Sequence, residues 1–236
     1  AGINAHNKVH ETEEFILNRD EAYIGVLIDD LITKGTEEPY RMFTSRAEYR
    51  LLLRQDNADI RLTGKSHKMG LADETRLKNV EHKIKASNEL EEYLKSTSLK
   101  PGIINPILAS IDSSAVDQAY RASQILTRPN MTLDKLSEID FIRDKTIEFS
   151  EEVKEQAEIN IKYKGYIEKE KENVAKLNRL ETIKIPGDFD YSKIGSLSSE
   201  AKQKLSKVQP KTIAQAARIS GVSPSDINVL LIYLGR

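Results

Sequence analysis

Five arginines lie between positions 41 and 61 and form the densest group of side chains that could bind a polyanion: Arg41, Arg46, Arg50, Arg54 and Arg61. A guanidinium group donates two parallel hydrogen bonds to a phosphate, so such a group is typical of nucleic-acid contacts. Ser45 followed by Glu48 has the spacing of a capping box, which predicts that a helix starts there. In that helix Arg46, Arg50 and Arg54 would form a stripe, either contacting a polyanion or holding an internal domain interface.

A second group combines lysines and tyrosines around Gly165. Residues 162–169 read Lys-Tyr-Lys-Gly-Tyr-Ile-Glu-Lys. Glycine within a helix costs about 1 kcal/mol relative to alanine, and it usually permits a close approach of something else. The pattern predicts either a tight helix crossing in the core or a surface that binds a partner or RNA.

Other kinds of chemistry find little support in the sequence. The absence of cysteine excludes a disulfide framework, a thiolate zinc site and a cysteine nucleophile. His6 and His10 have the spacing of a helical metal pair but no visible third ligand, so we expect no metal site. There is no glycine-rich phosphate loop and no recognisable Ser-His-Asp arrangement, so no catalytic residue is assigned.

Residues 214–227 imitate a DNA-reading helix-turn-helix, with Gly221 at the turn. The second helix of this motif, residues 226–234, is apolar almost throughout and has no arginine or lysine. Phosphates and base edges are contacted mainly by such polar and basic side chains, so this helix is expected to pack rather than to read DNA.

The composition favours a mostly α protein. The chain has 236 residues, of which 39% are hydrophobic and 31% charged, enough for one large or two small domains. Its net charge of −1 means that any basic surface must be local. The apolar runs are too short to span a membrane and no secretory signal opens the chain, so a cytoplasmic location is expected.

Hydrophobic periodicity predicts the positions of most helices. Longer helices are expected at about residues 73–95, 114–126 and 151–180, with a short one at 132–136. Three short helices are expected at about residues 198–208, 212–220 and 225–234. Residues 23–32 are a buried strand or a short helix, and the alternation at residues 58–63 predicts a short strand or extended segment.

Several blocks of sequence, in order, resemble one family. Residues 38–50 read Glu-Pro-Tyr-Arg-Met-Phe-Thr-Ser-Arg-Ala-Glu-Tyr-Arg, and further similar blocks lie at residues 1–5, 162–167, 186–198 and 217–224. With these blocks the chain resembles the carboxy-terminal part of the MnmG (GidA) family, the tRNA uridine 5-carboxymethylaminomethyl modification proteins.

The resemblance implies a flavoprotein that works with an MnmE-type GTPase. Together they would add an aminomethyl or carboxymethylaminomethyl group to carbon 5 of the wobble uridine in tRNA. The family uses FAD, NADH and a folate-derived one-carbon unit, and forms a homodimer. Because this chain has neither a glycine-rich FAD fingerprint nor cysteine, we expect no cofactor on it and no catalysis by it alone.

The resemblance also implies a division into three parts. Residues 1–62 would be the end of the flavin-binding α/β domain with the arginine-rich helix. Residues 63–185 would form a helical domain, and residues 186–236 a small helical terminal subdomain.

Within the family this helical region is associated with tRNA and with the GTPase. The candidate tRNA-binding residues are Arg41, Arg46, Arg50, Arg54, Lys162 and Lys164. The candidate partner-binding residues are Tyr163, Tyr166, Lys169 and Arg218. The alternative is a docking scaffold that binds the GTPase without contacting tRNA, in which the arginines pack against the flavin-binding domain.

Overall fold

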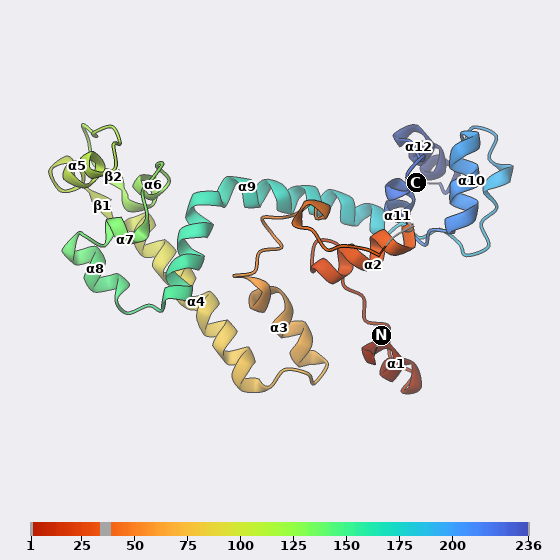
Figure 1. Cartoon of the computed structure of the whole chain (residues 1–236), viewed down its shortest axis with the longest axis horizontal. Coiled ribbons are helices and arrows are strands. Elements are labelled where there is room, and N and C mark those ends of the chain that lie inside the picture. The colour runs from red at the N-terminus through yellow and green to blue at the C-terminus, as the bar shows by residue number, and fades with distance from the viewer. Residues whose placement is uncertain (1, 34–38, 236) are drawn as a thin grey trace. The chain divides into compact units, whose positions relative to one another are not determined.

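The chain folds mostly into α-helices, as expected (Figure 1). The computed structural model describes residues 2–33 and 39–235, apart from the side chains of Leu177 and Glu181. Unit 1 comprises the residues up to Leu53 and those from Lys169 onward, and unit 2 comprises Arg54–Glu168. The division predicted at residues 62 and 185 stays a prediction. Among the helices described, none combines the length and apolar composition that a bilayer span requires.

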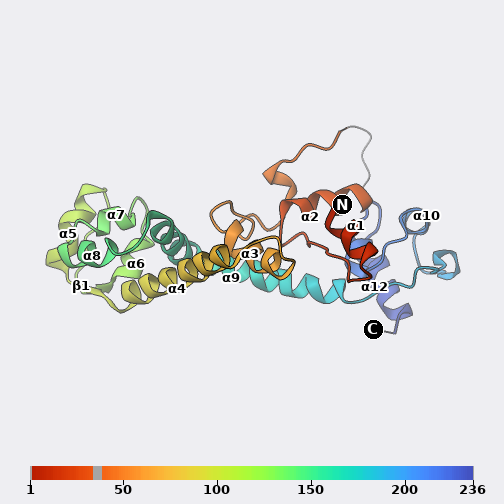
Figure 2. The same cartoon turned by 90° about the horizontal axis from the view of Figure 1, so that it is seen from below.

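Unit 2 is a set of helices with a very small sheet. Its helices are α3 (Ala58–Lys68), α4 (Glu74–Ser96), α5 (Pro101–Ser110), α6 (Ala122–Leu126), α7 (Leu133–Leu136), α8 (Asp140–Thr146) and the first part of α9 (Glu151–Glu181). The strands β1 (Ser98–Leu99) and β2 (Tyr120–Arg121) pair antiparallel, with Ser98 opposite Arg121. In both views α3 lies beside α4 (Figure 1, Figure 2).

The core of unit 2 is aliphatic. Leu90 and Leu94 of α4 are fully buried, and they belong to one cluster with Ile104 of α5, Leu126 of α6 and Ala157 of α9. Burial of aliphatic side chains is the main favourable contribution to folding, so this cluster holds the short helices around α4 and α9.

Unit 1 is built from both ends of the chain. Its elements are α1 (Gly2–Val9), α2 (Tyr23–Thr33), the 3-10 helix η1 (Thr44–Arg46), the rest of α9, the 3-10 helix η2 (Tyr191–Lys193), α10 (Ser199–Val208), α11 (Ile213–Arg218) and α12 (Pro224–Tyr233). The last three helices surround a core in which Tyr191, Leu205 and Leu230 are fully buried. The helices predicted for this end of the chain are confirmed, as are those predicted for residues 73–95, 132–136 and 151–180.

The helix predicted from Ser45 is wrong, because only the three-residue η1 forms there and turns follow it. The carboxylate of Glu48 does not close a capping box, since it pairs with Arg19 at 2.8 Å. Ala47 and Leu53 are buried with Val26 of α2. Tertiary contacts therefore override the local helix signal, and the predicted arginine stripe does not exist.

Two further local predictions are wrong. Residues 58–63 begin α3 instead of forming an extended segment, and Lys83 of α4 pairs with Asp59 at 3.0 Å to hold this helix. The helix predicted for residues 114–126 begins only at Ala122. The side chain of Asn105 bonds both the amide and the carbonyl of Val116, at 2.8 and 3.0 Å, and such side-chain bonds compete with helix formation.

Asp226 ties together the starts of two helices in unit 1. Its carboxylate accepts a hydrogen bond from the Ser198 amide at 2.9 Å and from the Ser223 hydroxyl at 2.6 Å. Ser198 and Ser223 are the N-caps of α10 and α12. Burial raises the pKa of Asp226, but the hydrogen bonds from Ser198 and Ser223 outweigh burial and leave the pKa below its ordinary value.

We expect Asp226→Ala to lower the free energy of unfolding of unit 1 by about 1–3 kcal/mol, because the amide of Ser198 and the hydroxyl of Ser223 lose a charged acceptor. The contribution of Asp226 should be present above the ordinary carboxyl pKa of about 4 and decline as the pH falls, since its folded pKa is lowered. Urea unfolding of wild type and variant between pH 3 and 7 would measure both effects. The exposed Asp188→Ala is the control, and equal losses in the two variants would contradict the prediction.

Removing the side-chain oxygen of Tyr191, unlike removing the carboxylate of Asp226, should not destabilise unit 1. Its hydroxyl has no hydrogen-bond partner among the described residues, and burial raises the pKa of Tyr191 to about 12. Its ring packs edge-on against Phe189 with the ring centroids 4.9 Å apart. Tyr191→Phe keeps this packing and removes the unpaired hydroxyl, so the thermal midpoint should stay the same or rise. A clear fall in the midpoint would show that the hydroxyl is stabilising.

Candidate nucleic-acid and partner interface

The part of α9 that belongs to unit 2 has an open face of lysine and tyrosine. Tyr166 is 67% exposed, and Tyr163 is exposed as well. Among the described residues, the one ion pair of Lys164 is with the exposed Glu168, at 3.9 Å. A Cβ atom placed on Gly165 would meet no atom within 4 Å among the described residues. A tight helix crossing at Gly165 is therefore not seen in the described part of the chain, and the face is accessible.

Lys162 differs from its neighbours because its ammonium group is used within unit 2. It donates to the carbonyl of Met131 and to the carboxylate of Glu158, the latter at 2.6 Å. The bond to Met131 holds α9 to the residues just before α7, whereas the bond to Glu158 lies within α9. Of the lysines predicted to bind tRNA, Lys164 is the more accessible, and the role of both stays a prediction.

The arginines predicted to bind tRNA lie in different surroundings. Arg41 and Arg50 are exposed. The guanidinium of Arg46 lies 4.2 Å from the ring centre of Tyr40. Arg54 belongs to unit 2 and pairs with Asp56 at 3.0 Å. No helix aligns Arg46, Arg50 and Arg54 as predicted, so any tRNA contact by each arginine stays a separate prediction.

Unit 1 contains a buried ionic cluster that the sequence does not predict. Arg19 is only 7% exposed, and its guanidinium lies 3.0 Å from Asp29, 2.7 Å from Asp30 and 2.8 Å from Glu48. The hydroxyl of Tyr40 donates to Asp30 at 2.7 Å. Burial lowers the pKa of Arg19, but the bonds and charges of Glu48 and Asp30 outweigh burial, so the arginine stays charged. No spacing rule identifies partners so far apart along the chain.

Arg218 joins the same cluster from the other end of the chain. Its Nε and Nη2 atoms donate to the two carboxylate oxygens of Asp29, at 2.7 and 2.8 Å. This two-pronged pair ties α11 to α2, and the side chain of Arg218 is 21% exposed. The guanidinium predicted to bind a partner thus already has an acceptor within unit 1. Its role in partner binding stays a prediction, as does that of the exposed Lys169.

Lysines of α10 and the loop after it form another exposed basic surface. Residues 202–211 contain four lysines and no acid. Lys204, Lys207 and Lys211 are exposed, and none of the ion pairs in the described part of the chain involves them. The excess of lysine in residues 202–211 is the sequence feature that predicts this surface. The net charge of −1 does not reveal it, because acids elsewhere in the chain balance these lysines.

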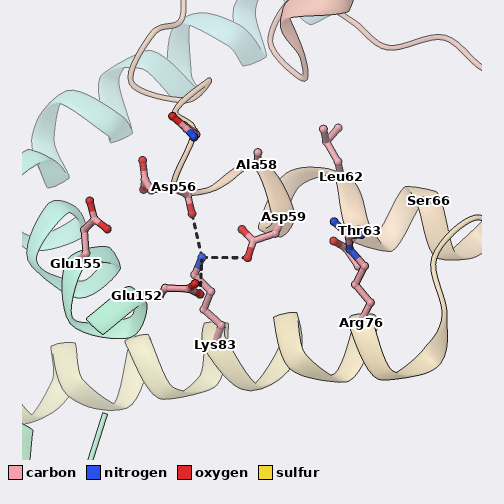
Figure 3. A pocket seen from close by; sticks show the side chains of 11 residues that line it. Asp56, Ala58, Asp59, Leu62, Thr63, Ser66, Arg76, Lys83, Glu152 and Glu155 are labelled. Carbon is pink, nitrogen blue, oxygen red and sulfur yellow. Dashed lines mark hydrogen bonds and ion pairs between the residues drawn. The ribbon is translucent and has the colours of Figure 1, made fainter. Parts of the chain in front are cut away.

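A charged cleft of about 710 Å³ lies between α3, α4 and the start of α9 in unit 2 (Figure 3). The ammonium of Lys83 donates to the carbonyl of Asp56 and the carboxylate of Asp59, both at 3.0 Å. Glu152 and Glu155 also line the cleft. Carboxylates outnumber the basic groups, Arg76 and Lys83, so the cleft is unsuited to a phosphate group.

Two family models match most of the chain. Residues 74–171 match the tRNA modifying enzyme MnmG/GidA C-terminal helical domain, and residues 173–236 match the MnmG/GidA C-terminal helical bundle. The chain belongs to the MnmG/GidA family. The resemblance identified in the sequence is therefore confirmed.

Relatives that carry the name tRNA uridine 5-carboxymethylaminomethyl modification enzyme MnmG match the whole chain. The protein from Christiangramia forsetii is 58% identical and that from Flavobacterium psychrophilum 56% identical, each over 100% of this chain and 38% of the relative. The crystal structure of Aquifex aeolicus GidA in form II matches with a TM-score of 0.79 and 41% identity, over 100% of this chain and 36% of that one. The chain thus spans about two-fifths of the length of these curated relatives.

Removing Arg218 should destabilise unit 1, because a mostly buried carboxylate loses a charged partner. We expect Arg218→Met to lower the free energy of unfolding by about 1–3 kcal/mol. This loss is smaller than that for breaking a fully buried ion pair, because Arg19 still contacts Asp29 in the variant. Lys193→Met removes an exposed pair with Asp190 and should cost about 0–1 kcal/mol. Urea unfolding measures the free energy of unfolding of both variants. Similar losses would show that the Arg218–Asp29 pair stabilises unit 1 no more than an exposed pair does.

Proposed function

We propose that this chain is the tRNA- and GTPase-contacting region of a flavin-dependent enzyme that modifies carbon 5 of the wobble uridine in tRNA. The observation that carries the proposal is the open lysine and tyrosine face of α9, in a member of a family whose relatives are named as tRNA uridine modification enzymes. The same combination of side chains suits binding better than catalysis.

The chemistry of this face suits single-stranded or looped RNA. Lys164 can neutralise a phosphate, and exposed tyrosine rings can stack on unpaired bases, which is how loops of RNA are commonly bound. Lys204, Lys207 and Lys211 add positive charge elsewhere in the chain. Since the net charge of the chain is −1, affinity for a polyanion must come from such local surfaces.

FAD and NADH belong to this proposal as cofactors of the whole enzyme, which would act as a cytoplasmic homodimer with an MnmE-type GTPase. The charged cleft of unit 2 does not suit FAD. The cleft shown in Figure 3 has four carboxylates on its walls, from Asp56, Asp59, Glu152 and Glu155, which would repel a diphosphate.

A docking scaffold without tRNA contact is the second candidate function. One observation favours it: Ile232 of α12 is 76% exposed and its neighbour Tyr233 is also exposed. Apolar and aromatic side chains at a surface are typical of protein interfaces. On this alternative the GTPase would bind at α12.

We expect the chain to bind unmodified tRNA with an affinity that falls steeply with salt. Lys164→Glu should weaken binding and lower the slope of log affinity against log salt by about 1, and Tyr166→Ala should cost about 1–3 kcal/mol per stacked base lost. Lys78→Glu is the matched control, since Lys78 is an exposed lysine of the same unit that pairs with Glu74. Fluorescence anisotropy at several salt concentrations measures these effects.

Calorimetric titration with the partner GTPase separates the two candidate functions. Saturable GTPase binding without tRNA binding, abolished by Ile232→Asp, would replace the proposal by the docking scaffold. Identical tRNA affinity of wild type and the two α9 variants would remove α9 from the binding surface. Binding of neither ligand would refute both candidates.

A further inference from the structure

A short open strand edge follows α9 in unit 1. Residues 183–185 pair antiparallel with residues 211–213, the segment that leads into α11. Two backbone hydrogen bonds join the segments, at 2.9 and 3.0 Å, and they use the amide of Ile185 and the carbonyl of Ile183. One side of residues 183–185 is therefore already occupied by the chain itself.

The backbone of Lys184 faces the other side. In a strand, the N–H and C=O groups of successive residues point to opposite sides. Since Ile183 and Ile185 bond residues 211–213, the N–H and C=O groups of Lys184 point away from that segment. In the described part of the chain neither group has a hydrogen-bond partner. Unpaired backbone groups at an edge are a template for the addition of another strand.

The edge is limited at both ends. Pro186 has no N–H group to donate. The amide of Thr182 already donates to the carbonyl of Asn178, at 3.2 Å. Between these positions Lys184 offers one donor and one acceptor, enough for two hydrogen bonds to a single residue of an added segment.

A pocket of about 500 Å³ lies along this edge. The residues that line it are Thr182, Ile183, Lys184, Pro186 and Leu234. Residues 211–213 do not line the pocket, which places it on the side with the free groups of Lys184. Ile183 and Leu234 are partly buried against the core of unit 1, so they give the pocket aliphatic walls. An aliphatic side chain of an added segment suits these walls.

The charges around the edge favour an acidic segment. Lys184 and Lys211 are exposed, and none of the ion pairs in the described part of the chain involves them. Residues 202–211 contain four lysines and no acid. Pairing of two copies at this edge would bring their lysines together, and lysine and proline at an edge generally prevent such self-pairing. Carboxylates of another segment would be attracted instead.

We propose that residues 182–186 bind an acidic peptide segment of a partner protein as an added β-strand. The backbone of Lys184 exchanges two hydrogen bonds with this segment, and one aliphatic side chain of the segment fills the pocket beside Leu234. Lys184 and Lys211 attract its carboxylates. The site uses no residue of the lysine and tyrosine face of α9, so the inference does not depend on tRNA binding.

A synthetic peptide tests the proposal. The probe is a fluorescein-labelled peptide in which aspartate and valine alternate around a central leucine, and fluorescence anisotropy measures its affinity for the chain. Each backbone amide of the peptide is N-methylated in turn, which removes one N–H group and keeps the charge. We expect one of these peptides to bind at least about fivefold more weakly, as for the loss of one hydrogen bond. Its two neighbours, whose N–H groups point away from the edge, should bind nearly as the unmodified peptide does.

The NMR signal of the Lys184 amide is the second readout. We expect this amide to exchange with solvent more slowly when the peptide is bound, because its N–H group gains an acceptor. The amides of α4 in unit 2 are the control and should exchange at an unchanged rate. This measurement uses the unaltered chain, so misfolding of a variant cannot produce the result.

A charge in the pocket gives a third comparison. Leu234→Asp should weaken binding of the peptide about tenfold, because a carboxylate there repels an acidic peptide and replaces an aliphatic wall. Leu71→Asp is the matched control, since Leu71 is an exposed leucine of unit 2. It should leave the affinity unchanged.

Several results would overturn the proposal. Equal affinities of all the N-methylated peptides would show that no strand is added. Equal binding of a peptide with lysine in place of aspartate would show that the partner is not selected for acidity. Slower exchange of the Lys184 amide with tRNA but not with the peptide would assign the edge to RNA. Lack of any peptide binding would remove residues 182–186 as a docking site.

Discussion

The charge of Arg19 is the constraint on which unit 1 depends. A guanidinium this deeply buried is tolerated only if carboxylates surround it, because an unpaired buried charge is very costly. Asp29, Asp30 and Glu48 supply that charge from α2 and from the segment after η1. This requirement, with the burial of Ala47 and Leu53, fixes the irregular path around residue 48.

Asp29 then extends the constraint to the end of the chain. It carries one negative charge but contacts both Arg19 and Arg218. The helices of the terminal bundle are therefore joined to α2 by an ionic contact in addition to their own aliphatic core. One consequence is that Arg218, which the sequence suggests as a surface residue, joins two segments of unit 1, whereas Lys164 of α9 and Lys204 and Lys207 of α10 are exposed.

The extent to which the structure follows from the sequence depends on the range of the interactions. The helix from Glu74 and the long helix α9 follow from periodicity and from local caps such as Asp73, all within a few residues. The path of the chain after Ser45 does not follow from local sequence, because Glu48, the expected capping partner of Ser45, pairs with Arg19, which lies 29 positions away. For the candidate interface, the residue types around Gly165 were recognisable, but which of them are already paired, such as Lys162 with Glu158, required the structure.

The discontinuity of unit 1 has a consequence for how the protein is made. Arg218 and Asp29 are separated by 189 positions in the sequence. All residues of unit 2 come between the two segments of unit 1 along the chain. Domains generally fold as units during synthesis, starting from the amino terminus. On the ribosome, α2 therefore emerges long before the helix that supplies Arg218, and unit 2 has left the exit tunnel in the meantime. Until then Asp29 lacks its pair with Arg218, and the aliphatic side chains of α2 are exposed to aggregation.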